Sequence, residues 1–277
     1  MGKAEEAKEA EEPIVLYCIR VPVDPGINLN PLFPFTFTLH KSTLMIFPIG
    51  DEQVKGGYKP LISYLLIVIN VLVFMFQVTL PPGYEQGFVM TYGMIPKEIA
   101  HGQDYFTLFT NMFLHGGWMH LIGNMLFLWV FADNIEAVIG KIPFILFYFG
   151  GGLAASAAHI LFNLNSSIPA IGASGAISAV LGAYLVMFPA SKIKVFVLIF
   201  FRSFYMPALF FLGIWGVQQF INGFISIVPS TAYTSGVAWF AHIGGFVFGL
   251  ICGFLIRRRY ESRYGYDMDS PSPRDLV

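Results

Sequence analysis

Charged residues are scarce in this chain of 277 residues. They make up 12% of it, against about 25% in an average soluble domain, whereas hydrophobic residues make up 56%. Two stretches, 142–191 and 203–256, contain no Asp, Glu, Lys or Arg. Each is about 50 residues long and has room for two membrane-spanning helices of about 20 residues. The sequence therefore predicts an all-α, polytopic integral membrane protein rather than a soluble domain.

Cysteine is also nearly absent, because the chain contains only Cys18 and Cys252. The two cysteines lie in very different segments, so we expect neither a disulfide framework nor a metal site. The first thirty residues have no long apolar stretch, and we therefore expect no cleavable signal peptide. The formal net charge of −1 gives no indication of a nucleic-acid partner.

The apolar segments and the turn residues between them predict a six-helix transmembrane domain over 60–256. The expected spans are 61–80, 118–132, 142–162, 172–188, 204–228 and 236–256, of which the fourth is short. Residues 1–59 are expected to form a largely extended cytosolic tail, and residues 257–277 a basic cytosolic tail.

A long connection, residues 81–117, separates the first two spans. Apolar residues recur there at helical spacing, at Tyr105, Leu108, Phe109, Met112 and Phe113. This pattern predicts a half-submerged interfacial helix or, equally well, a loop helix packed on the bundle.

The basic residues predict the orientation in the membrane. They flank the spans on one side, at Lys55, Lys59, Lys141, Lys192, Lys194, Arg202, Arg257, Arg258, Arg259 and Arg263. The loops on the other side contain only Lys97. Because cytoplasmic loops carry the excess of Lys and Arg, both termini are expected to face the cytoplasm.

Four polar residues are expected at one depth on three parallel helices. His120 lies near the start of the second span, Ser174 near the start of the fourth, and His242 about six residues into the sixth. At 1.5 Å per residue, all three fall within about 10 Å of the outer boundary. Asn124 follows His120 by four residues and shares its helix face. These four residues therefore predict a single polar site.

The remaining polar residues of the spans are interpreted as helix-to-helix hydrogen bonding. This group consists of Asn70, His159, Gln218, Gln219 and Asn222.

The four clustered residue types suit acyl transfer. A serine hydroxyl needs a neighbouring base to act as a nucleophile, and His242 can supply one. Asn124, His120 and the Ser174 backbone N–H can donate hydrogen bonds to a developing oxyanion. The nearest carboxylates, Asp133 and Glu136, lie roughly 13–18 Å farther along the helix. We therefore expect a Ser–His dyad, and the group that orients His242 is left open.

A ridge of small residues on the sixth span supports this interpretation. Gly245, Gly249 and Gly253 form a GxxxGxxxG pattern on nearly the same face as His242. Such a ridge allows two helix backbones to pack closely. Packing against the fourth span would bring His242 towards Ser174.

Three stretches together resemble one family, the rhomboid intramembrane serine proteases. They are HGGWMHLIGN (115–124), GASG (172–175) and AHIGG (241–245) followed by Gly249, and the resemblance extends over about residues 45–260. It implies a rhomboid-type bundle with Ser174 as nucleophile, His242 as general base, and His120 and Asn124 in the oxyanion hole. It also implies cleavage of single-span membrane proteins within the lipid bilayer, without a metal or other cofactor. A prokaryotic inner membrane is the expected location.

This chain departs from the family pattern at two places. Phe106-Thr107 stands where many members have a Trp-Arg pair, and Ser178 stands where some have a tyrosine that stacks on the histidine. Glu136, in contrast, matches a family glutamate and is interpreted as structural.

Two alternatives stay open at this point. A catalytically inactive relative would bind membrane clients without cutting them, although such a protein would be expected to lack Ser174 or His242. A transporter or channel would be expected to show internal repeats or charges at mid-depth, and the sequence has neither.

Overall fold

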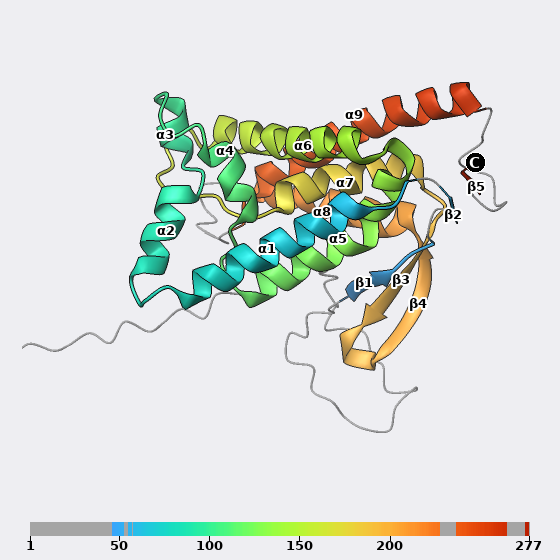
Figure 1. The fold of residues 1–277 in the computed structure, drawn as a ribbon, viewed down its shortest axis with the longest axis horizontal. Coiled ribbons are helices and arrows are strands. Elements are labelled where there is room, and N and C mark those ends of the chain that lie inside the picture. Colours follow the sequence, from blue (N-terminus) through green and yellow to red (C-terminus); the bar gives the residue numbers. More distant parts are fainter. Residues whose placement is uncertain (1–45, 53–54, 57, 228–236, 265–274, 277) are drawn as a thin grey trace, which may run out of the picture.

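Helices make up most of the chain, and they run alongside one another as a bundle (Figure 1). The computed structural model describes residues 46–52, 55–56, 58–227, 237–264 and 275–276. Its long helices are α1 (Leu61–Thr79), α5 (Trp118–Ile139), α6 (Lys141–Phe162), α7 (Ser174–Met187), α8 (Ala208–Ser226) and α9 (Trp239–Tyr264). Among the described residues, α1, α5, α6, α8 and α9 are long and apolar enough to cross a membrane. The predicted helical membrane bundle is confirmed, whereas the number of spans and the orientation remain predictions.

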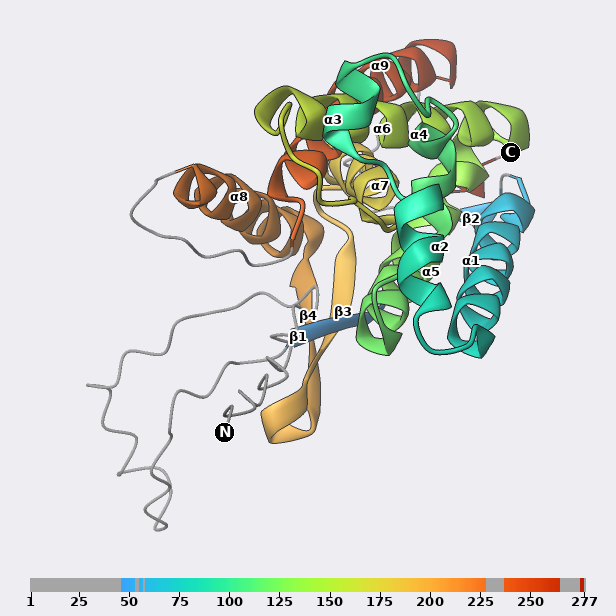
Figure 2. The same ribbon diagram turned by 90° about the vertical axis from the view of Figure 1, so that its left-hand side faces the viewer.

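Helix α7 corresponds to the short fourth span. Its 14 residues extend about 21 Å, less than the roughly 30 Å hydrocarbon core. Figure 2 shows α7 in the middle of the bundle, and all its residues except Leu185 and Val186 are buried. Because neighbouring helices surround it, α7 does not have to match the bilayer thickness. Its N-terminal residue Ser174 can therefore lie in a recess.

The buried carboxylate of Glu136 joins α5 to the start of α1. Its Oε1 accepts the Ile62 N–H at 2.9 Å, and its Oε2 accepts the Ser63 N–H at 2.8 Å and the Ser63 hydroxyl at 2.7 Å. These amides belong to the first turn of α1, where no intrahelical acceptor exists. Helix α5 therefore continues seven residues beyond the predicted end at 132, with Glu136 inside the protein.

The connection 81–117 contains four short helical segments in place of one. They are α2 (Tyr84–Tyr92), α3 (Pro96–Ala100), α4 (Thr107–Thr110) and the 3₁₀ turn η1 (Asn111–Phe113). The predicted helix is therefore present but short. It turns Thr107, Asn111 and Met112 inward, whereas Phe109 is 46% exposed. Met94 and Ala170 exchange two backbone hydrogen bonds of 3.0 and 2.8 Å, which tie this connection to the loop before α7.

A small antiparallel sheet, which the sequence analysis did not predict, lies at the other end of the bundle (Figure 1). Its strand order is β1 (Ile46–Gly50), β3 (Lys192–Val197) and β4 (Arg202–Pro207). Strand β4 occupies the predicted start of the fifth span, so α8 begins only at Ala208. Asp51, directly after β1, accepts hydrogen bonds from the Asn134 amide and the Tyr184 hydroxyl. These bonds join the sheet to α5 and α7.

The parts of residues 1–59 and 257–277 that the structure describes contain strands and a helix, and not only the extended tails that were predicted. Residues 1–45 and the predicted turn 229–235 lie outside the described residues. Strand β1 belongs to the sheet, and a two-residue strand, β2 (Lys55–Gly56), pairs in parallel with β5 (Asp275–Leu276). Helix α9 continues past 256 to Tyr264, so the first basic residues of the predicted C-terminal tail are helical.

Candidate active site

Ser174 and His242 are in direct contact. Ser174 is the first residue of α7, and His242 lies in the first turn of α9. The Ser174 Oγ is 2.9 Å from the His242 Nε2, and both residues are buried, with exposed fractions of 6% and 4%. The structure therefore brings together the two side chains that the sequence analysis placed in one site.

The glycine ridge of α9 makes this contact possible. A Cβ atom on Gly245 would lie 2.1 Å from the Gly175 carbonyl oxygen, and one on Gly249 would lie 2.0 Å from the Ala179 carbonyl oxygen. Real Cβ atoms do not approach so closely, so only glycine permits this distance between α7 and α9. The ridge packs against the helix that carries Ser174. This packing was predicted because the glycines lie on nearly the same face of the helix as His242.

The open question of what orients His242 is answered by Gln219 on α8. The His242 Nδ1 is 2.9 Å from the Gln219 Oε1. The Gln219 Nε2 donates to the Trp215 carbonyl at 3.2 Å, which fixes the amide with its oxygen towards the imidazole. Because an amide oxygen can only accept, Nδ1 carries the proton. Nε2 is then unprotonated and faces the Ser174 hydroxyl.

Two tryptophan rings pack near the imidazole. The ring centroid of His242 is 6.2 Å from that of Trp215 and 6.1 Å from that of Trp239. Ser178, at the place where some rhomboids have tyrosine, donates instead to the Ser174 carbonyl at 2.7 Å. The imidazole is therefore positioned by Trp215 and Gln219 of α8 and by Trp239 of its own helix, α9. The Ser178 hydroxyl makes its hydrogen bond within α7.

His120 points at the loop in front of Ser174. The Gly116 N–H donates to the His120 Nδ1 at 3.3 Å, so Nε2 carries the proton of the neutral ring. A Cβ atom on Gly172 would lie 2.7 Å from this Nε2, and Gly172 also has a φ of +123°. Glycine is therefore required at 172 both for the backbone conformation and for the approach of His120.

Asn124 lies one turn after His120 on α5 and faces the same loop. Its Nδ2 is 3.6 Å from the position of a Cβ on Gly172, and the side chain is fully buried. Neither amide atom has a hydrogen-bond partner among the described residues. A buried amide without a partner costs free energy. This amide is therefore suited to receive a group that is present only with a substrate.

The segment before α5 is fixed to α1 by Gln77, which the sequence analysis did not single out. Its amide accepts the His115 N–H at 3.1 Å and donates to the His115 carbonyl at 3.2 Å. The His115 ring packs against that of His120, with 5.1 Å between the centroids. Burial lowers the pKa of His115 to about 3, with a smaller contribution from His120, so His115 stays neutral at physiological pH.

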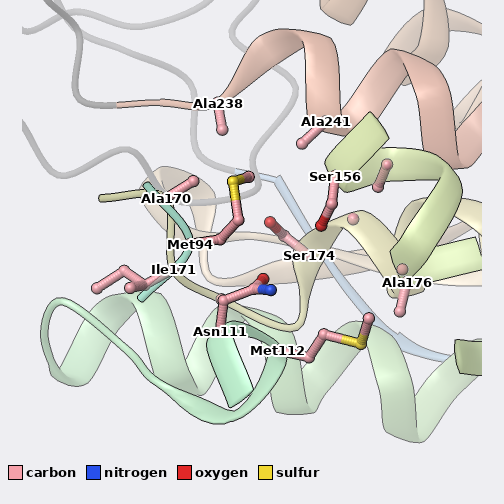
Figure 3. Close-up of a pocket in the computed structure, with 14 residues that line it drawn as sticks. Met94, Asn111, Met112, Ser156, Ala170, Ile171, Ser174, Ala176, Ala238 and Ala241 are labelled. Atoms are coloured by element: carbon pink, nitrogen blue, oxygen red, sulfur yellow. The ribbon is translucent and has the colours of Figure 1, made fainter. Parts of the chain in front are cut away.

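The site opens into a small cavity, whose lining includes Ser174, Asn111 and Met94 (Figure 3). The cavity volume is about 20 Å³, enough for a water molecule. The Asn111 carbonyl accepts the Gly172 N–H at 2.9 Å, and Thr107, at the family's Arg position, donates through its hydroxyl to the Asp104 carbonyl at 2.7 Å. In this chain the loop is therefore anchored by small polar side chains and backbone groups.

The other polar residues of the spans are placed as follows. Asn70 donates to the Leu66 carbonyl of its own helix at 2.8 Å, so the interpretation as helix-to-helix bonding is wrong for this residue. The His159 Nδ1 and the Gln218 Oε1 are buried without a hydrogen-bond partner among the described residues. Gln219 does bond across two helices, as interpreted, but its partner is His242. The interpretation as helix-to-helix bonding therefore missed that Gln219 belongs to the site.

The comparison with protein families agrees with this geometry. A family model described as the rhomboid domain matches residues 102–259, more than half of the chain. The chain belongs to the rhomboid family. The matched region contains Ser174, His242, His120 and Asn124, and the predicted rhomboid-type helical bundle is confirmed.

Individual rhomboid relatives come from several kinds of organism. The chain is 28% identical over 210 residues to "Rhomboid protein 1, mitochondrial" of Saccharomyces cerevisiae, covering 72% of this chain and 54% of the relative. It is 30% identical over 135 residues to "Rhomboid protease GluP" of Bacillus subtilis, covering 49% and 26%. It is 31% identical over 178 residues to "RHOMBOID-like protein 1" of Arabidopsis thaliana, covering 64% and 40%. The chain spans about half or less of these relatives.

The comparisons and the apolar helices together indicate a multi-pass integral membrane protein of the rhomboid family. Gln219, Trp215, Trp239 and Gln77 are among the residues around the site that the sequence analysis missed. The one available signal was Gln219 itself, a polar side chain in a span. It could not be connected to His242 because the rotation of α8 relative to α9 is not visible in the sequence.

Proposed function

We propose that this rhomboid-family chain is an intramembrane serine endopeptidase that works through a Ser174–His242 dyad. The observation that carries the proposal is the 2.9 Å contact between the Ser174 Oγ and an imidazole nitrogen that its own hydrogen bonding leaves unprotonated. A serine in contact with an oriented base is the arrangement that nucleophilic catalysis requires.

In the first half of the reaction, the Ser174 Oγ attacks the carbonyl carbon of the scissile peptide bond, and its proton passes to the His242 Nε2. The oxyanion accepts hydrogen bonds from the His120 Nε2–H, the Asn124 amide and the Ser174 backbone N–H. His242 then gives its proton to the leaving nitrogen, the C–N bond breaks, and an acyl-enzyme remains. In the second half, water attacks the ester carbonyl with His242 again as base. His242 then returns this proton to the Ser174 Oγ as the ester C–O bond breaks, and the new carboxylic acid leaves.

Gln219 acts in this scheme as a positioning residue. It keeps the Nδ1–H of His242 in place, so that Nε2 is always the nitrogen that faces Ser174. It also accepts a hydrogen bond from the imidazolium formed during each proton transfer. This role resembles that of the acid in a Ser–His–Asp triad, without a buried charge.

The substrates in this proposal are single-span membrane proteins. A substrate segment enters past α8 and the turn that follows it, and it must unwind, since a helical peptide bond is shielded from attack. Water reaches Ser174 from the outer face, both termini lie in the cytoplasm, and residues 1–59 and 257–277 lie on the cytosolic side. The location is a prokaryotic inner membrane, and the reaction needs no metal or other cofactor.

The test is labelling of the detergent-purified protein with a fluorescent fluorophosphonate, followed by cleavage of a model membrane substrate. The wild type should be labelled and active. Ser174→Ala should lose both labelling and cleavage while keeping the thermal unfolding temperature. Ser178→Ala is the matched control, because it removes a buried hydroxyl from the next turn of the same helix, and it should keep both.

Three results would reject the proposal. Cleavage retained in Ser174→Ala would show that the nucleophile is wrong. A folded wild type that is neither labelled nor active on any membrane substrate would favour the inactive, client-binding relative, and transport activity in sealed vesicles would favour the transporter.

A variant of Asn124 tests the oxyanion donors separately. Asn124→Ala is expected to lower kcat on the order of 10²–10³-fold, which is typical for loss of one such donor. Asn70→Ala removes an amide that bonds only within α1, and it should leave kcat nearly unchanged. Equal effects of the two variants would mean that Asn124 has a packing role only.

A further inference from the structure

The turn between β3 and β4 exposes four consecutive apolar side chains. Leu198, Ile199, Phe200 and Phe201 have exposed fractions of 39%, 47%, 62% and 79%, and we call them the hairpin tip. Clusters of large apolar side chains on an exposed surface mark contacts with protein or membrane. The proteolytic mechanism proposed above makes no use of them.

The hairpin tip lies beside the bundle and not beyond its end. In Figure 1, strands β3 and β4 leave the right-hand end of the bundle and slant back beneath the helices. Figure 2, which looks along the bundle, shows the same strands projecting sideways past α5 and α8. The tip therefore lies outside the ring of helices, where a membrane-embedded bundle is surrounded by lipid.

The hairpin continues directly into a lipid-facing surface. Strand β4 ends at Pro207, and α8, a candidate span, begins at the next residue. Near that start, Leu209 and Phe210 are 52% and 59% exposed. The apolar surface of α8 and that of the hairpin are thus joined at the membrane boundary.

The backbone at Phe201 is strained. Its φ of 47° lies in the left-handed region, which glycine and asparagine adopt readily and a bulky residue does not. A glycine would relax this turn, yet the position carries the most exposed aromatic ring of the hairpin. Strain that is kept at one position suggests that the side chain has a function.

The rest of the hairpin is held firmly and carries positive charge. Ile193 and Val195 are fully buried, and Val197 is 6% exposed, so one face of β3 is anchored in the core. Lys194 and Arg202 belong to the two strands that support the tip. Basic residues next to inserted aromatic residues attract anionic lipid headgroups, which is a common feature of interfacial anchors.

We propose that the hairpin tip inserts into the membrane leaflet on the sheet side of the bundle, among the acyl chains, with Lys194 and Arg202 at the anionic headgroups. Acyl chains then cover Phe200 and Phe201, and their burial offsets the strain at Phe201. By the positive-inside rule, this is the cytoplasmic leaflet. The inference needs only the membrane embedding of the chain and not its proteolytic activity.

The experiment measures the depth of one tip residue by spin labelling. In full-length protein with Cys18→Ser and Cys252→Ser, Ile199→Cys receives a nitroxide, and the protein is placed in nanodiscs of phosphatidylcholine and phosphatidylglycerol. Arg259→Cys is the matched site, because it is exposed on the part of α9 beyond its apolar segment. At 199, dissolved oxygen should relax the label more than a water-soluble nickel chelate does, and at 259 the order should reverse.

A second variant tests whether the protein or the label drives insertion. Phe201→Gly relieves the backbone and should leave folding in detergent intact, but it should clearly reduce the ratio of oxygen to nickel accessibility at 199. An unchanged ratio would overturn the proposal. High nickel accessibility at 199 in the parent protein would place the tip in water. Low accessibility of the label to both reagents would mean that protein covers the tip, either residues 1–45 or a second copy of the chain. A tip in water and a tip covered by protein would each overturn the proposal.

Discussion

Helix α9 contacts α7 and α8 in two different ways. Against α7 it packs backbone to backbone, because Gly245 and Gly249 leave no room for even one methyl group beside the Gly175 and Ala179 carbonyls. Against α8 it packs through side chains. A Cβ on Gly216 would meet the ring edge of Phe246 at 2.9 Å, and one on Gly223 would meet the end of Ile243 at 2.7 Å.

This difference separates a rigid from an adjustable part of the site. Ser174 and His242 belong to the two helices in backbone contact, so their distance cannot change without moving whole helices. Gln219 belongs to α8, whose contact with α9 can adapt through rotation of side chains. An adjustable α8 next to a rigid dyad is consistent with the proposed entry of substrates past α8.

The largest expected effect is that of filling the rigid contact. Gly249→Ala places a Cβ about 2 Å from the Ala179 carbonyl oxygen, so the two backbones must separate. We expect a loss of roughly 3 kcal/mol in unfolding free energy, the upper part of the usual range for overpacking, and loss of fluorophosphonate labelling. Thermal unfolding in detergent measures the first. Gly213→Ala on α8 is the control, because nothing lies within 4 Å of the added Cβ. Equal stability of both variants would contradict the assignment of a rigid contact.

A smaller effect is expected at the link between α8 and the dyad. Gln219→Leu removes the acceptor for the His242 Nδ1–H. Loss of one hydrogen bond of about 1.4 kcal/mol corresponds to roughly tenfold lower kcat/KM. Gln219→Glu keeps an acceptor oxygen and should recover part of the rate, a rescue that a purely structural role would not produce.

Its matched control is the neighbouring amide. Gln218→Leu changes the preceding residue of α8, whose Oε1 has no hydrogen-bond partner among the described residues, and it should alter kcat/KM less than twofold, or by less than about 0.4 kcal/mol. The nitrogen chemical shifts of the His242 ring would report the tautomer directly. A wild-type ring with its proton on Nε2 would be incompatible with the role given to Gln219.

The smallest effect is expected in the adjustable contact. Gly216→Ala meets only the ring edge of Phe246, which can rotate away. We expect a change of about 1 kcal/mol or less in unfolding free energy and little change in cleavage. If this variant were as damaging as Gly249→Ala, the two contacts of α9 would not differ in kind.

The site residues could largely be predicted, because helix periodicity and depth are local properties of the sequence. Ser174, His242, His120 and Asn124 were expected at one depth, and the structure brings Ser174 to His242 and both His120 and Asn124 to Gly172. Gln219 was assigned to ordinary helix-to-helix bonding. Whether an amide reaches a given imidazole depends on how α8 is rotated and offset against α9, and nothing within either segment encodes that.

The sheet was missed for a different reason. Lys192 to Val197 do alternate between less and more buried residues, as a strand with one buried face would. The stretch is short, however, and it lies between apolar segments, so its local pattern favours a loop followed by the start of a span. Its partner β1 lies about 140 residues away in the chain, and such a distant pairing cannot be recognised from local pattern.

The sequence by itself determined that the chain is a helical membrane protein, and it predicts four polar residues at one depth, because hydrocarbon imposes a strong constraint on each segment separately. The tertiary structure decided which nitrogen of His242 faces Ser174, how closely α7 and α9 approach, and where the hairpin tip points. Those features depend on the relative placement of segments far apart in the chain, which packing and hydrogen bonding fix only when the helices come together.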